Sequence, residues 1–121
     1  MPHCILEASS DLLDQPDWAG LLREINGTLV ATGLFTTADI KSRFLRHDVF
    51  AIGDGNLGQA FVTLNVQILE GRTDEVKALL SEALLPVLVK AFPRTLAQMT
   101  CSLTVQITDI HRPSYRRQIS Y

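Results

Sequence analysis

The sequence is poor in cysteine, in long apolar runs and in net charge. Its only cysteines, Cys4 and Cys101, stand in apolar segments without CxxC spacing. We therefore predict two small buried hydrophobic side chains, not a disulfide or a thiolate metal site. No apolar run approaches the roughly 20 residues needed to cross a bilayer. The N-terminus lacks a basic segment followed by an apolar stretch, so we expect no signal peptide, no membrane association and a cytoplasmic location.

The charge balance does not indicate a broad positively charged surface of the kind that binds nucleic acids. Eleven Lys and Arg residues stand against 13 Asp and Glu residues, which leaves a net charge of −2. A few local cations still suffice to bind a small anion. The three histidines show no metal-ligand spacing, so we predict no metal site. With 121 residues, of which 46% are hydrophobic and 20% charged, residues 1–121 are predicted to form one domain.

Strand, helix and strand alternate twice along the sequence. Extended segments are predicted at residues 2–8, 40–50, 60–69 and 98–110, where β-branched, aromatic or alternating apolar residues concentrate. One helix is predicted to open at Pro16 and Asp17, with Gly33 as its C-terminal cap. Its apolar residues recur at helical spacing: Trp18, Leu21, Leu22, Ile25, Leu29 and Val30. A second helix follows Thr73 as N-cap, and Pro86 is expected to kink it or end it early.

Two halves with the same element order, about 1–58 and 59–110, suggest an internal repeat, followed by a polar tail at 111–121. Helical connections favour parallel pairing within each half. The predicted fold class is α/β, in an α+β two-layer sandwich: two consecutive βαβ repeats form a four-stranded sheet, and two helices cover one face.

The last two predicted strands alternate apolar residues with uncharged polar ones. Thr63, Asn65 and Gln67 share one face of residues 60–69, and Ser102 and Thr104 lie on the corresponding face of residues 98–110. A solvated sheet face usually carries Lys and Glu, so uncharged side chains favour a face covered by another subunit. A simply hydrated face is the alternative, because threonine is a good strand former.

Pro2 would become the N-terminal residue if the initiator methionine were removed. It would then carry a free secondary amine, which nearby cations and burial bring toward the pKa of a base that works near neutral pH. The alternative is that Pro2 is merely a stiff second residue. If Met1 is retained, the Pro2 nitrogen is an amide and cannot accept a proton.

Three cations are candidates for binding an anionic ligand. Lys41 and Arg43 are two residues apart and so share a strand face, where they either bind a carboxylate or protect an exposed strand from aggregation. Arg72 precedes the second helix, a common position for anion sites, although a plain surface role is the alternative. Arg116 and Arg117 are interpreted as solvated residues of the tail.

Several segments together resemble a known family. They are residues 1–9 (Met-Pro-His-Cys-Ile-Leu-Glu-Ala-Ser), 26–35, 40–43, 53–55, 60–62 and 71–72. They follow one another in the family's order, without large gaps, from Met1 to about Ile110. Together they resemble the 5-carboxymethyl-2-hydroxymuconate isomerases. These belong to the tautomerase superfamily, related in fold to 4-oxalocrotonate tautomerase and macrophage migration inhibitory factor. The tail after His111 matches less well.

The resemblance implies a tautomerase-like homotrimer that isomerises 5-carboxymethyl-2-hydroxymuconate without a cofactor, in the degradation of homoprotocatechuate or 4-hydroxyphenylacetate. If the family's residue roles apply to the matching positions, Pro2 is the catalytic acid and base. Lys41, Arg43 and Arg72 then bind the carboxylates of the small anionic dienol substrate. Lys41 stands where the family pattern has an arginine, and lysine lacks the bidentate fork. Two alternatives stay open: a tautomerase of another unsaturated keto or enol acid, and a catalytically inactive trimeric binding module of the same fold.

Overall fold

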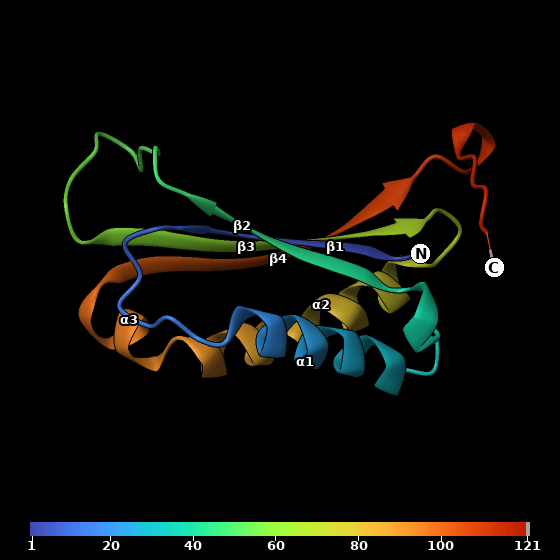
Figure 1. The fold of residues 1–121 in the computed structure, drawn as a ribbon, viewed down its shortest axis with the longest axis horizontal. Coiled ribbons are helices and arrows are strands. Elements are labelled where there is room, and N and C mark those ends of the chain that lie inside the picture. The colour runs from blue at the N-terminus through green and yellow to red at the C-terminus, as the bar shows by residue number, and fades with distance from the viewer. Residues whose placement is uncertain (121) are drawn as a thin grey trace.

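The computed structural model of the chain describes residues 1–120. Its elements are, in chain order, β1 (His3–Ser9), α1 (Trp18–Ala31), η1 (Thr37–Asp39), β2 (Lys41–His47), β3 (Gln59–Leu69), α2 (Asp74–Ala91), α3 (Pro93–Gln98), β4 (Thr100–Ile110) and η2 (Arg112–Ser114). Within residues 1–120, four strands form one sheet in the order β2-β1-β3-β4. The helices α1 and α2 lie along one face of that sheet, while no helix or second sheet from the described residues covers the other face (Figure 1).

Pairing within the sheet confirms the predicted βαβ units. β1 runs parallel to β2, and β3 runs parallel to β4, as expected for strands joined through helices. The two units meet where β1 and β3 pair antiparallel, with Leu6 opposite Leu64. The predicted two-layer architecture is therefore confirmed.

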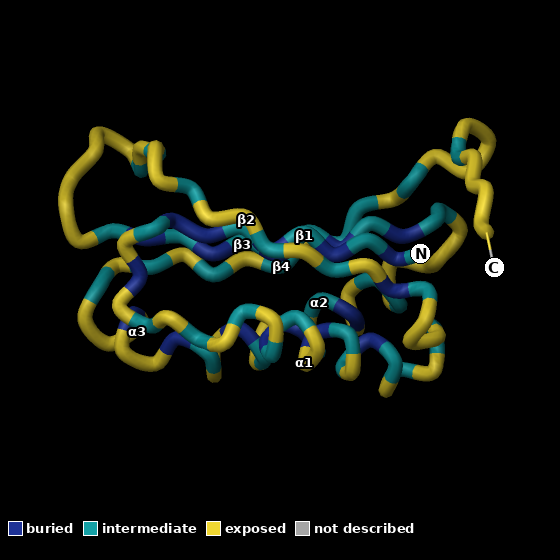
Figure 2. Tube along the Cα trace, viewed as in Figure 1, coloured by how far each residue is buried: buried dark blue, intermediate teal, exposed yellow. Residues whose placement is uncertain are grey.

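The core lies between the sheet and the helices (Figure 2). On β3 the inward residues Val62, Leu64, Val66 and Ile68 are at most 2% exposed, which confirms the predicted alternation. The helices contribute leucines and an isoleucine four residues apart, one α-helical turn: Leu21, Ile25 and Leu29 from α1, and Leu80, Leu84 and Leu88 from α2. Both cysteines are free; Cys4 is buried in this core and Cys101 is half-buried on the edge strand β4.

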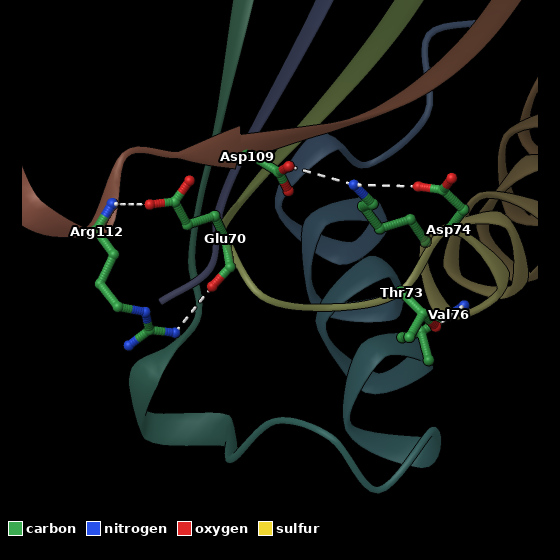
Figure 3. Close-up of polar contacts among 7 residues, drawn as sticks. Glu70, Thr73, Asp74, Val76, Asp109 and Arg112 are labelled. Carbon is green, nitrogen blue, oxygen red and sulfur yellow. Dashed lines mark hydrogen bonds and ion pairs between the residues drawn. The ribbon is translucent and has the colours of Figure 1, made fainter.

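Two predicted helix ends are confirmed. Gly33 follows α1 with a φ of 79°, a left-handed conformation that glycine adopts without steric cost, and its N–H donates to the Val30 carbonyl at 3.0 Å. Thr73 caps α2, where its hydroxyl accepts a hydrogen bond from the Val76 N–H at 3.2 Å (Figure 3).

Three element boundaries differ from the predictions. Of the two effects expected of Pro86, the early end is not observed: α2 continues to Ala91, because Leu84 and Leu88 on either side of Pro86 are buried in the core. The strand predicted at residues 40–50 ends at His47. Gln98 is the last residue of α3, a short helix that the sequence did not predict, and β4 begins only at Thr100.

Within residues 1–120, no helix has both the length and the apolar character needed to span a membrane.

Candidate active site

One end of the sheet gathers the start of the chain, the start of β2 and the ends of β3 and β4 (Figure 1). This follows from the pairing, because β1 and β2 begin at the same end and the antiparallel β3 finishes there, with β4 beside it. The arrangement brings segments that are far apart in sequence close to the N-terminus.

Pro2 is buried immediately before β1. Its carbonyl accepts a hydrogen bond from the Lys41 N–H at 3.1 Å, which extends the β1–β2 pairing to the proline. The sheet thus fixes the position of Pro2, and with Met1 attached the Pro2 nitrogen is part of a peptide bond.

Met1 occupies the space directly outside Pro2. Its amino group donates to the Asp39 carbonyl at 3.1 Å, and its Sδ accepts a hydrogen bond from the Tyr115 hydroxyl at 3.0 Å. Burial lowers the pKa of this amine most, and the charge of Lys41 lowers it further. The charge of Asp39 opposes these effects, and Arg117 adds a smaller lowering. A base at this position is therefore more readily neutral than a free amine in water.

A pocket of about 220 Å³ opens beside Met1. We call it the arginine pocket, and its lining includes Met1, Phe35, Asp39, Leu69, Arg72 and Arg112. Arg72 donates to the Leu34 carbonyl at 3.4 Å, and its guanidinium lies 5.7 Å from the centre of the Phe35 ring. The structure thus brings Arg72 to the same pocket as the residue that precedes Pro2.

A second pocket, of about 320 Å³, lies against the start of β1 and β2 and is lined by the tail. We call it the tail pocket; it is formed by His3, Lys41 and residues 115–119. Arg116 and Arg117 are exposed, but both line this pocket, and Arg117 lies 4.0 Å from the Asp39 carboxylate. Their interpretation as merely solvated residues was incomplete, because the chain turns back after β4 toward the N-terminus.

Lys41 and Arg43 are exposed on β2, opposite His3 and Ile5 of β1. Lys41 Nζ donates to the Asp39 carbonyl at 3.3 Å, and Arg43 Nη1 lies 3.2 Å from His3 Nδ1. Burial lowers the pKa of His3, with Arg43 the next contributor. Lys41 lines the tail pocket, whereas Arg43 lines neither pocket, so the structure does not bring all three predicted cations together.

Sequence reasoning missed Arg112, which lines the arginine pocket with Arg72. The signal lies in the pairing of β3 with β4, where Leu69 is opposite Ile110. Because parallel strands end at the same edge, residues shortly after Leu69 and Ile110 become neighbours.

In the described part of the chain, no three His, Cys, Asp or Glu side chains cluster as metal ligands.

Comparisons with known proteins agree with this arrangement. The family model for 5-carboxymethyl-2-hydroxymuconate isomerase matches residues 2–119. A 5-carboxymethyl-2-hydroxymuconate Delta-isomerase from Escherichia coli is 32% identical over 111 residues, covering 92% of this chain and 88% of the relative.

Two solved structures extend the comparison. A 5-carboxymethyl-2-hydroxymuconate isomerase from Deinococcus radiodurans R1 superposes with a TM-score of 0.89 at 32% identity, covering 98% of this chain and 90% of the other. A fused 4-OT described as a symmetric trimer matches in fold alone, with a TM-score of 0.73 at 21% identity, covering 95% and 90% of the two chains. The predicted resemblance is confirmed: this chain belongs to the 5-carboxymethyl-2-hydroxymuconate isomerase family.

Proposed function

We propose that this chain isomerises 5-carboxymethyl-2-hydroxymuconate, as a homotrimer, with the Pro2 amine as acid and base once Met1 has been removed. The observation that carries the activity is the family match over residues 2–119, together with 32% identity to the Escherichia coli isomerase. The burial of Pro2 at an end of the sheet rich in cations supports the assignment of the base.

The proposed reaction moves one proton and leaves the enzyme unchanged. The neutral Pro2 amine takes the proton of the substrate's 2-hydroxyl, and the electron pair shifts through the conjugated chain. The protonated amine then delivers that proton to a carbon of the diene, which gives the keto isomer and regenerates the neutral amine. Conjugation makes the hydroxyl proton acidic, so the proposal needs neither a metal nor an organic cofactor.

Cations near the N-terminus have two roles in this proposal. They bind the carboxylates of the substrate, for which we assign Arg72 in the arginine pocket and Lys41 in the tail pocket. They also lower the pKa of the Pro2 amine in this proposal, as Lys41 lowers the pKa of the Met1 amine. Arg43, which contacts His3 beside Lys41, is assigned to the same charged surface.

The trimer is proposed from the uncovered sheet face. Thr63, Asn65 and Gln67 of β3 point away from the helices and carry no charge. A related fold, the fused 4-OT, is described as a symmetric trimer.

The decisive test compares two preparations of the same chain. One carries an uncleaved N-terminal tag and the other is cleaved to start at Pro2, with both termini verified by intact-mass spectrometry. We expect the blocked chain to lose about 100-fold or more of its kcat on the muconate, the usual scale of general acid–base catalysis.

Full activity of the blocked chain would remove Pro2 from the mechanism. If neither preparation turns over the muconate, ketonisation of phenylenolpyruvate distinguishes the remaining possibilities. Activity on that simple enol would identify a tautomerase of another substrate, and inactivity would identify a binding module.

A further inference from the structure

Arg112 lies after the last strand, outside the segments that suggested a site, yet it lines the arginine pocket of the candidate active site. It is the second residue after β4, and Arg72 is the third residue after β3. Because β3 and β4 are parallel and end with Leu69 opposite Ile110, both arginines reach the arginine pocket.

The Arg112 side chain is held by the backbone of the neighbouring strand end. Its Nη2 donates to the Glu70 carbonyl at 3.0 Å. The same nitrogen lies close to Gly71, 3.9 Å from the position that a Cβ atom would take if this residue carried a side chain. The Glu70 carboxylate accepts from the Arg112 backbone N–H, also at 3.0 Å (Figure 3). The guanidinium is therefore positioned without being neutralised.

Within residues 1–120, neither Arg72 nor Arg112 forms an ion pair with a carboxylate. Asp39 also lines the pocket, but its carboxylate accepts a hydrogen bond from the Thr36 hydroxyl at 2.7 Å and lies 4.0 Å from Arg117. Arg72 and Arg112 thus both line this pocket, and each guanidinium donates to one backbone carbonyl and has further N–H donors. Such an arrangement favours the binding of carboxylates.

We propose that Arg112, with Arg72, binds the two neighbouring carboxylates at one end of the substrate and so selects for the carboxymethyl group. The inference rests on the proposed function. In 5-carboxymethyl-2-hydroxymuconate, the terminal carboxylate and the carboxymethyl arm are both attached at carbon 5, in a succinate-like arrangement. Two separately anchored arginines match two such carboxylates, whereas 2-hydroxymuconate presents only one there.

The test is the selectivity of Arg112→Gln between these two substrates. We expect kcat/KM for the carboxymethyl compound to fall by about 10- to 100-fold, the usual effect of losing a hydrogen bond between charged groups, and that for 2-hydroxymuconate to change less than about threefold. Arg112→Lys should recover part of the selectivity, because it keeps the charge but loses the fork. Arg23→Gln is the matched control, since Arg23 lies on α1 and contacts Asp17.

An equal fall on both substrates, or no fall on either, would overturn the proposal. Calorimetric titration with propane-1,2,3-tricarboxylate measures binding to the subsite without requiring catalysis. It therefore tests the subsite separately from the proposed isomerase function. If the wild-type chain is inactive but binds this tricarboxylate more tightly than Arg112→Gln does, the subsite stands and the isomerase assignment fails. If the wild-type chain is active and Arg112→Gln keeps its selectivity, the isomerase assignment stands and the subsite fails.

Discussion

Lys41 shows how a single charge next to the N-terminus affects its chemistry. Its backbone N–H contacts the Pro2 carbonyl, and its ammonium contacts the carbonyl of Asp39, which also accepts a hydrogen bond from the Met1 amine. Its charge is the second contributor, after burial, to the lowered pKa of that amine.

Replacing Lys41 with Gln should raise the pKa of the N-terminal amine, because a positive charge that destabilises the protonated form is removed. In the chain cleaved to Pro2, the rise of activity with pH should shift to higher pH by the same cause. NMR titration of a labelled terminus measures the first effect and a pH–rate profile the second. Arg43→Gln is the control, since Arg43 is not among the groups that perturb this amine. An unchanged pKa in Lys41→Gln would show that the charge of Lys41 does not contribute to the shift.

How far single residues could be predicted depends on how local their signal is. Pro2 could be named as a candidate base from its position in the chain alone. Lys41 and Arg43 could be assigned to one strand face from their spacing. Arg112 became recognisable only once β3 was known to lie beside β4, and the contacts of the tail with Met1 and Asp39 follow from a turn that no residue pattern announces.

At the scale of elements, α3 depends on a distant carboxylate. Asp14, in the loop after β1, accepts hydrogen bonds from the N–H groups of Arg94 at 3.3 Å and Thr95 at 2.7 Å. The buried Thr95 hydroxyl donates to Asp14 at 2.7 Å and accepts from the Leu13 N–H at 3.1 Å. This contact ties the first half of the chain to the second.

Asp14→Asn should destabilise the fold by about 1–2 kcal/mol, because the amide NH2 that replaces one carboxylate oxygen cannot accept the hydrogen bonds from α3 that this oxygen accepts. Burial raises the pKa of the Asp14 carboxyl, but the hydrogen bonds from Thr95 and Arg94 outweigh it and hold the pKa below its ordinary value. The folded state therefore binds this proton less readily than the unfolded state, and the stabilisation present above the ordinary carboxyl pKa is lost as pH falls through the lowered one. Urea unfolding at several pH values measures both effects.

Asp17→Asn is the matched control, because Asp17 is exposed, its side chain makes no cap hydrogen bond to α1, and it lies 3.8 Å from Arg23. Equal stability of Asp14→Asn and wild type at neutral pH would show that Asp14 does not support α3.

Pro86 offers a second test at this scale. It lies inside α2 at an exposed position, where proline lacks the N–H that a helix interior uses. Pro86→Ala should stabilise the protein by about 1–2 kcal/mol, because the helix gain of up to ~3 kcal/mol is partly offset by the greater freedom of the unfolded chain. The shift of the urea midpoint measures this. A loss of stability would indicate that the ring makes a favourable contact in the folded protein.

The elements themselves were largely predictable, because alternation and helical spacing are local signals. Thr73 and Gly33 marked helix ends for reasons that act within one turn. The continuation of α2 past Pro86 is a tertiary effect, since Leu84 and Leu88 on either side of it are buried in the core. The short helix α3 escaped prediction because its supporting carboxylate lies about 80 residues away in the sequence.

At the scale of the whole molecule, the uncovered sheet face leads to the quaternary prediction. Light scattering at micromolar concentration should return about 40 kDa, three times the 13.4 kDa of one chain. Thr63→Lys should lower this mass, because it places a charge in the middle of the uncovered face of β3. Leu79→Lys, on the outer side of α2 at 54% exposure, is the control and should leave the mass unchanged. A single-chain mass for the wild type would refute the trimer.

The antiparallel seam between β1 and β3 has a consequence for how this architecture can be re-engineered. The seam makes the two βαβ units point in opposite directions, so the start of β3 lies at the far end of the sheet from Pro2. Gln59 begins β3 there, as an internal residue with an amide nitrogen. Severing the polypeptide in the loop before Gln59 would give two fragments, and the second would present an amino terminus of its own at that far end. A two-fragment version whose second fragment begins with proline in place of Gln59 would test this. It would show whether a free secondary amine at the far end of the sheet acts as a base, which the unbroken chain cannot provide there.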